Sequence, residues 1–317
     1  MSNEINRLSL SNQFTADDTE IDIREIFFAV WQGKWLVIGI TAIFAIFSVI
    51  FALLQPNIYK SEVLLAPVGE EQAGGLSGLA SQFGGLASIA GINVGNGGGV
   101  DKTQMAIEVL KSRQFVSQFI QKHNILADLI AAETWDLTTN TLSYTEELYD
   151  AKLNVWTREV KKPFKPEPSM QEAFKVFSDV VSVNQFKETG MVTVSVEHVS
   201  PYVAQQWVVW LVEDINSVMK ERDVSEAIKS SEFLNKQIAL TNVADIRSIL
   251  YKLIEEQAKT IMFAEVRDEY VFKTIDKAIV PEEKFKPSRA LICILGTLIG
   301  CFLSIAFILI RYFSRKS

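Results

Sequence analysis

The side chains that most often carry out catalysis are scarce in this chain. Its only histidines, His123 and His198, are widely separated, and both cysteines, Cys293 and Cys301, fall in one apolar stretch. The sequence contains no convincing Ser–His or Cys–His pair, metal-ligand spacing or carboxylate dyad. We expect both histidines to be structural or solvent-exposed, and we predict no catalytic activity, no metal site and no cofactor.

A glycine-rich stretch invites comparison with a phosphate-binding loop. Residues 99–103 read G-V-D-K-T, so glycine and lysine are not adjacent and the G-K-[ST] core of a nucleotide-binding loop is missing. Eleven of the 16 glycines lie in residues 69–99, and residues 72–100 carry no charge. So much glycine raises the entropic cost of ordering and favours a mobile loop. A loop that packs only when protomers assemble stays open as a second interpretation, with candidate inter-protomer positions Gly84, Gly85 and Gly91.

Two uncharged apolar stretches, residues 35–54 and 290–310, lie on either side of a large central region. As helices each would be about 30 Å long, the thickness of a bilayer's hydrocarbon core. The first is not a cleavable signal peptide, because six acidic residues precede it and no A-x-A site follows. We predict two transmembrane helices with one large domain, residues 55–289, between them.

The flanking charges favour cytoplasmic ends for both spans. Lys34 precedes the first span, and Arg311 begins a basic segment, residues 311–317, after the second. Basic residues at positions 284, 286 and 289 soften this bias, although long loops translocate largely regardless of charge. Within residues 1–34, apolar positions recur with helical period at 23–31, which predicts an amphipathic helix in the membrane interface. The net charge of −7 argues against nucleic-acid binding.

The central domain mixes strand and helix signals. Alternating apolar residues predict a strand at 59–68 and a hairpin formed by residues 180–186 and 191–197. One helix is expected over residues 101–121 and a last strand over residues 270–280. Residues 126–160 alternate helical and turn signals without a firm assignment, and three prolines make residues 161–168 a surface connection. These elements predict an α/β base.

A long helical arm is expected between residues 201 and 267. Ser200-Pro201 is a helix start signal, and no glycine or proline interrupts the chain to residue 240. Thr241-Asn242 predicts a break and a new cap. Forty residues of helix span about 60 Å, too long for a compact domain to enclose. The fold class is therefore α+β, a base with an extended helical arm between two transmembrane helices, and the arm predicts self-association.

Small and rigid residues gather around the second span. Pro281 and Pro287 stiffen the approach to it, and Gly296 and Gly300 form a G-x-x-x-G motif inside it. Small residues four positions apart let helix backbones approach closely in lipid. We predict that these four residues serve transmembrane packing or contact with a partner.

Several segments, taken in order, resemble one family over the whole chain. They are I-D-I-R-E at 21–25 leading to W-x-x-K-W at 31–35, A-S-Q-F-G-G-L-A-S-I-A-G at 80–91, I-E-V-L-K-S-R at 107–113, S-V-E-H at 195–198, and residues 281–300. In order and spacing they resemble the polysaccharide co-polymerases, the Wzz-type chain length determinants of bacterial surface polysaccharides.

The resemblance implies an inner-membrane protein with a periplasmic base and helical arm. Family members assemble into rings and set how many repeat units a membrane polymerase adds to a lipid-linked polysaccharide, and they are not enzymes. The expected partners are therefore other copies of the chain, the polymerase and the polysaccharide, with lipopolysaccharide O-antigen as the first candidate. The family's packing residues correspond to Pro281, Pro287, Gly296 and Gly300.

Two further functions fit a large domain between two membrane spans. One is a membrane adaptor that activates a separate tyrosine kinase in capsule or exopolysaccharide export. Some relatives continue into such a kinase, which the segment after residue 310 does not contain. The other is a receptor, which is disfavoured because residues 1–34 and 311–317 offer no room for an output module.

Overall fold

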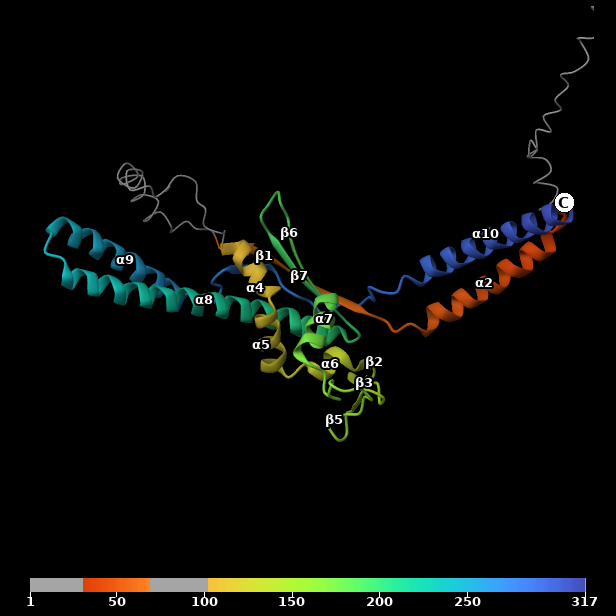
Figure 1. Ribbon diagram of the computed structural model, residues 1–317, viewed down its shortest axis with the longest axis horizontal. Helices are drawn as coiled ribbons and strands as arrows, with labels where there is room; N and C mark the ends of the chain where they lie inside the picture. The colour runs from red at the N-terminus through yellow and green to blue at the C-terminus, as the bar shows by residue number, and fades with distance from the viewer. Residues whose placement is uncertain (1–30, 69–101, 317) are drawn as a thin grey trace, which may run out of the picture. The chain divides into compact units, whose positions relative to one another are not determined.

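The computed structural model describes residues 31–68 and 102–316 (Figure 1). The described residues form two compact units, one within residues 1–55 and 288–317 and the other within residues 56–287. Most of the predicted amphipathic helix at 23–31 lies outside the described residues. So does the glycine-rich segment 69–99 with Gly84, Gly85 and Gly91.

The first unit is a pair of apolar helices, α2 (Lys34–Leu54) and α10 (Arg289–Lys316), which pack along each other (Figure 1). Lys34–Leu54 and Arg289–Arg311 are both long and apolar enough to cross a membrane.

The second unit is built on a four-stranded antiparallel sheet of order β6-β7-β1-β8. Its strands are β1 (Tyr59–Pro67), β6 (Val181–Gln185), β7 (Val192–His198) and β8 (Phe272–Asp276). The predicted hairpin is confirmed as β6–β7. Gly190 adopts φ +70° in its turn, a conformation that favours glycine.

The last strand is shorter than the predicted 270–280. After Asp276 the backbone carbonyls bond to side chains rather than to a strand. Ser61 Oγ donates to the carbonyl of Ile279 at 2.7 Å, and Gln205 Nε2 donates to that of Ala278 at 3.3 Å. These bonds replace the ladder, so β8 ends early.

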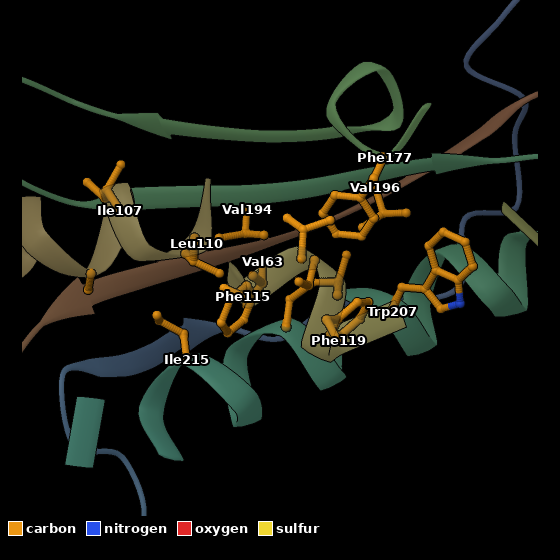
Figure 2. Packing of buried hydrophobic residues seen from close by; sticks show 14 of the residues in the cluster. Val63, Ile107, Leu110, Phe115, Phe119, Phe177, Val194, Val196, Trp207 and Ile215 are labelled. Carbon is orange, nitrogen blue, oxygen red and sulfur yellow. The ribbon is translucent and has the colours of Figure 1, made fainter. Parts of the chain in front are cut away.

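Helices pack on the apolar side of β1 and β7. They are α4 (Lys102–Leu110), α5 (Arg113–His123), α6 (Leu126–Ile130), α7 (Met170–Val180) and the first half of α8 (Pro201–Leu240). Val63 and Val194 are register partners at the centre of this core (Figure 2). Phe119 and Trp207, both almost fully buried, extend it along α5 and α8.

The single helix expected over residues 101–121 is wrong, because the chain breaks between α4 and α5. Ser112 adopts an extended conformation and its Oγ accepts a hydrogen bond from Phe115 N at 3.2 Å. A serine side chain in this role satisfies a free helix N–H group, so it starts a new helix.

Residues 132–156 form two small hairpins that the sequence analysis left unassigned. They are β2 (Ala132–Asp136) with β3 (Thr141–Tyr144), and β4 (Tyr149–Asp150) with β5 (Val155–Trp156). Both turns read D-x-x-x-N. In each the aspartate Oδ1 accepts two backbone N–H groups and the asparagine takes a left-handed conformation.

The helical arm is confirmed as a hairpin of α8 and α9 (Ala244–Val266) (Figure 1). Ser200 starts α8, since its Oγ accepts from Val203 N at 3.4 Å. The predicted cap at Asn242 is wrong, because α9 begins after Val243 without a side-chain cap.

One buried amide ties the arm to the sheet. Asn216 on α8 accepts hydrogen bonds at Oδ1 from the backbone N atoms of Tyr270, Val271 and Phe272, at 3.1, 2.8 and 3.0 Å. Its Nδ2 donates to the carbonyl of Phe272 at 3.1 Å. A single side chain therefore fixes the start of β8.

Candidate functional site

Both histidines hold the fold together. His123 stacks on Trp210 with ring centroids 4.2 Å apart, and its Nε2 lies 2.9 Å from Oδ2 of the buried Asp214. Lys122 Nζ donates to Oδ1 of the same carboxylate at 2.6 Å. Both oxygens of Asp214 and the ring of His123 are therefore engaged by neighbouring side chains, which gives His123 a structural role.

His198 is buried at the junction of β7 and α8. Its Nδ1 accepts from Ser200 N at 3.0 Å, and its Nε2 lies 3.0 Å from the carbonyl oxygen of Asp128. Burial is the largest influence on this imidazole and lowers its pKa. A neutral ring suits both bonds, because one nitrogen accepts and the other donates.

Lys102, the lysine of the G-V-D-K-T segment, is held by the arm. Its Nζ lies 2.9 Å from Asp223 Oδ2 on α8, and the Tyr270 hydroxyl donates to the same oxygen at 2.7 Å. Burial, followed by the bond to Asp223, raises the pKa of the Tyr270 phenol, so it remains a donor. Among the described residues no group of three or more His, Cys, Asp or Glu side chains could hold a metal ion.

The glycine motif on α10 lies directly against α2. A Cβ atom added at Gly296 would fall 2.5 Å from Ser48 Cβ, and one added at Gly300 would fall 2.5 Å from Phe44 Cβ. Atoms of these types do not approach so closely, so only glycine allows this helix separation. By contrast, Gly39 on α2 has nothing within 4 Å of the equivalent position.

Two hydrogen bonds join the same pair of helices near the end of α2 and the start of α10. Ser48 Oγ donates to the carbonyl of Ile292 at 3.1 Å, and Arg289 Nε donates to that of Ala52 at 3.1 Å. The arginine thus satisfies a carbonyl in the last turn of α2, where a positive charge is favoured.

The four residues predicted to serve transmembrane packing or partner contact lie in two different parts of the structure. Gly296 and Gly300 face α2, whereas Pro281 and Pro287 lie in the irregular segment after β8, with a cis bond at Lys286–Pro287. Sequence reasoning missed the positions on α2 that receive the glycines. The small side chains Ser48 and Ala52, four residues apart on α2, were the available signal.

Two protein-family profiles match parts of this sequence. The profile of the chain length determinant protein family, Wzz, matches residues 19–123. A second profile, GNVR, a G-rich domain whose description refers to tyrosine kinases, matches residues 240–313. A comparison of the sequence with curated proteins gave no match.

Two solved structures are similar to the chain. One is a full-length bacterial polysaccharide co-polymerase, at 13% identity over 93% of this chain and 99% of that chain, with a TM-score of 0.38. The other is a fragment of WzzB, a polysaccharide co-polymerase from Salmonella Typhimurium, at 12% identity over 73% of this chain and 100% of that chain, with a TM-score of 0.26.

The described residues form an α+β base with a helical arm, and two long apolar helices. The Wzz profile over residues 19–123 and the GNVR profile over residues 240–313 support the polysaccharide co-polymerase family of Wzz chain length determinants. The predicted resemblance and fold class are confirmed. Members of this family regulate chain length and are generally not enzymes.

Proposed function

We propose that this co-polymerase sets the length of lipopolysaccharide O-antigen by acting as an oligomeric scaffold in the bacterial inner membrane. In this proposal it limits the number of repeat units that a membrane polymerase adds to the lipid-linked chain. The observation that carries the proposal is the Wzz match over residues 19–123, which includes the first apolar helix and the first helices of the base.

The proposed topology follows the two apolar helices. Residues 35–54 and 290–310 cross the inner membrane, residues 55–289 form the periplasmic domain, and residues 1–34 and 311–317 are cytoplasmic. The length and composition of α2 and α10 support this arrangement, as do the basic residues next to each proposed cytoplasmic end.

The arm supports self-association. Among the residues of α9, all of them described, only Ala264 is buried. Large apolar side chains stay exposed along both arm helices, with Phe233 at 61% and Leu240 at 76%. A pair of helices alone cannot bury such surfaces, and a neighbouring copy of the same arm would cover them.

The outer faces of the two apolar helices support contact with the polymerase. The glycine face of α10 is filled by α2 of the same chain, so it is not available to another protein. Phe47 on α2 and Phe302 on α10 are largely exposed and face away from this packing. We assign polymerase contact to such outward positions.

The first experiment is deletion of the gene with plasmid complementation, read by resolving the surface polysaccharide on a gel. Length regulation predicts that polymer is still made but its preferred length disappears, and that the plasmid restores it. Complete loss of polymer would contradict the proposal. An unchanged O-antigen ladder would point to another polymer or to the less favoured alternative, an adaptor for a separate tyrosine kinase.

Scaffolding is tested separately with Phe233→Glu and the matched variant Asn235→Glu. Both introduce the same charge at exposed arm positions two residues apart, but only the first removes an apolar side chain. We expect Phe233→Glu to reduce the oligomer mass of the detergent-purified full chain and to broaden the ladder, with Asn235→Glu close to wild type. Equal behaviour of the two variants would argue against arm-to-arm contact.

A further inference from the structure

The two small hairpins of the base share one pattern of side chains. Each D-x-x-x-N turn directly follows an aromatic residue, Trp135 in the first hairpin and Tyr149 in the second. The indole Nε1 of Trp135 donates to Asn140 Oδ1 at 2.8 Å, and the hydroxyl of Tyr149 donates to Asn154 Oδ1. The same pairing of an aromatic ring with an asparagine amide therefore occurs twice.

Each of these asparagines keeps unused hydrogen-bond donors. An indole N–H can only donate, so the atom of Asn140 that it meets is the carbonyl oxygen, and the Nδ2 group is not used in this bond. Asn140 and Asn154 are both exposed, and neither Nδ2 group donates to another group among the described residues. Two amide donors, each beside an aromatic ring, are therefore available to a ligand.

Further aromatic rings connect the two hairpins. Tyr144 at the end of β3 contacts Tyr149 with ring centroids 5.5 Å apart, and Tyr149 contacts Trp156 with centroids 5.0 Å apart. Leu142 is the register partner of Trp135, and side chains two residues apart on a strand share a face. Trp135 and Tyr144 therefore lie on the same face of the first hairpin.

The rest of the base holds these rings in place. Trp135 contacts Tyr59 on β1 and Tyr202 in the first turn of α8, with centroids 5.7 and 5.9 Å apart. The Tyr144 hydroxyl donates to Asp128 Oδ1 on α6 at 2.6 Å. Tyr202 nevertheless stays 49% exposed. Rings fixed in this way lose little side-chain entropy when a ligand binds.

The surface around the rings is acidic and rich in hydroxyl groups. Residues 132–156 contain five Asp and Glu, one lysine and six Ser and Thr. Bonds from the backbone N–H groups of Thr138 and then Thr139 lower the pKa of the Asp136 carboxyl, so it stays ionised. Carboxylates repel phosphate and other anions, but they accept hydrogen bonds from hydroxyl groups. This surface therefore suits a neutral ligand with many hydroxyl groups.

We propose that the two hairpins bind two sugar units of one neutral polysaccharide chain. The C–H groups on the flat side of a sugar ring carry partial positive charge, which suits the negative face of an aromatic ring. Sugar hydroxyl groups accept hydrogen bonds from the Nδ2 groups of Asn140 and Asn154 and donate to the nearby carboxylates. Since the pattern is repeated, one protein chain holds a polymer more tightly than a single sugar unit. The inference rests on the proposed function, in which a polysaccharide is the regulated partner.

The test measures, by calorimetry, binding of polysaccharide to the full chain purified in detergent. The polysaccharide is taken from the strain that carries the gene and released from its lipid with mild acid. Asn140→Gly and Asn154→Gly each remove one amide. Both asparagines have a positive φ, 51° and 54°, which glycine adopts without strain, so the turns are kept.

Asn124→Gly is the matched control. Asn124 is also exposed, with φ 51°, but it lies at the end of α5, outside both hairpins. We expect each hairpin variant to weaken binding of the polysaccharide about 5-fold, the effect of one typical hydrogen bond, and the double variant about 25-fold. Asn124→Gly should bind like wild type. Alginate, an acidic polysaccharide, should bind at least about 10-fold more weakly than the released polysaccharide because of the carboxylates.

Several results would overturn the inference. They are a wild-type chain that does not bind the released polysaccharide, hairpin variants that bind it as tightly as Asn124→Gly, and alginate binding of equal strength. Reduced oligomer mass in the hairpin variants with unchanged polysaccharide binding would assign the hairpins to contact with protein instead.

The gene deletion tests the proposed function independently of this site. Loss of the preferred length on deletion, together with a purified chain that does not bind polysaccharide, would leave the function standing and refute the hairpin site. An unchanged ladder, together with polysaccharide binding that the hairpin variants weaken, would support the site and refute the proposed function.

Discussion

Replacing Gly300 with alanine tests whether the glycine motif serves packing within one chain. The added methyl group would lie 2.5 Å from Phe44 Cβ and 2.9 Å from its Cγ. These atoms are next to the backbone of α2, so rotating the ring cannot relieve the clash. Contacts between carbon atoms settle at about 3.5–4.0 Å, so the helices must separate by about 1 Å or more.

The expected cost follows from two opposing effects. Overpacking of a close interface costs about 1–3 kcal/mol. Alanine in a helix gains about 0.5–1 kcal/mol over glycine, and this gain also applies to Gly39→Ala on α2, where no atom lies within 4 Å of the new methyl group. Relative to Gly39→Ala, Gly300→Ala should therefore favour separation of the helices by about 5- to 150-fold.

The two cysteines supply the assay, because Cys293 and Cys301 both lie in α10 and are partly buried. A dye that fluoresces on reaction with thiols, added while the detergent-solubilised protein is heated, reports opening of the helix pair. The base has no cysteine, so its unfolding adds no direct signal. We expect the reaction to begin at a lower temperature in Gly300→Ala than in wild type, and not in Gly39→Ala.

Matching curves for Gly300→Ala and Gly39→Ala would refute the packing argument. A clear difference that vanished when the oligomer was dissociated would show that Gly300 faces another copy of the chain instead. Repeating the measurement with Gly296→Ala checks the neighbouring contact with Ser48.

Two further predictions concern the base. Asn216→Ala leaves three backbone N–H groups and one carbonyl without their present partner. It should lower the free energy of unfolding, measured with urea, by about 2–4 kcal/mol. The control Asn184→Ala, at an exposed position, should change this free energy by under about 0.5 kcal/mol. Burial lowers the pKa of His198 in the folded protein, so the unfolded chain binds a proton first as pH falls. The neutral, buried His198 therefore contributes its full stability above the unfolded pKa of 6.5, and this stability is lost progressively below that pH. Urea midpoints at about pH 7.5 and 5.5 should therefore diverge more for wild type than for His198→Gln, and an equal divergence would contradict the assignment.

The sequence predicted those helices and hairpins that are determined by residues close together in the chain. The absence of charge located the two apolar helices, and strict alternation located the β6–β7 hairpin. Ser200-Pro201 and a long run without glycine or proline predicted α8 to its last residue. In each of these cases the signal and the structure lie within the same few turns or residues.

Features that depend on contact between distant residues were not predictable in this way. Ser112 fits a continuous helical pattern as well as it fits a cap, and only its bond to Phe115 N decides between them. Asn216 looks like any polar residue of a long helix until β8 is placed beside it. The G-x-x-x-G motif was visible, and Ser48 and Ala52 offered a matching small-residue face on α2, but such a face does not specify its partner, so the contacts with Phe44 and Ser48 could not be assigned from the sequence.

The single helix α8 belongs to the base along its first half and to the arm along its second half. Its buried residues run from Pro201 to Met219 within the base, and beyond them only Ala227 is buried. Lengthening α8 and α9 together by seven residues each would extend the arm by about 10.5 Å and rotate its faces by only about 20°. The reach of the arm can therefore change over evolution in steps of two helical turns while the base keeps every one of its contacts.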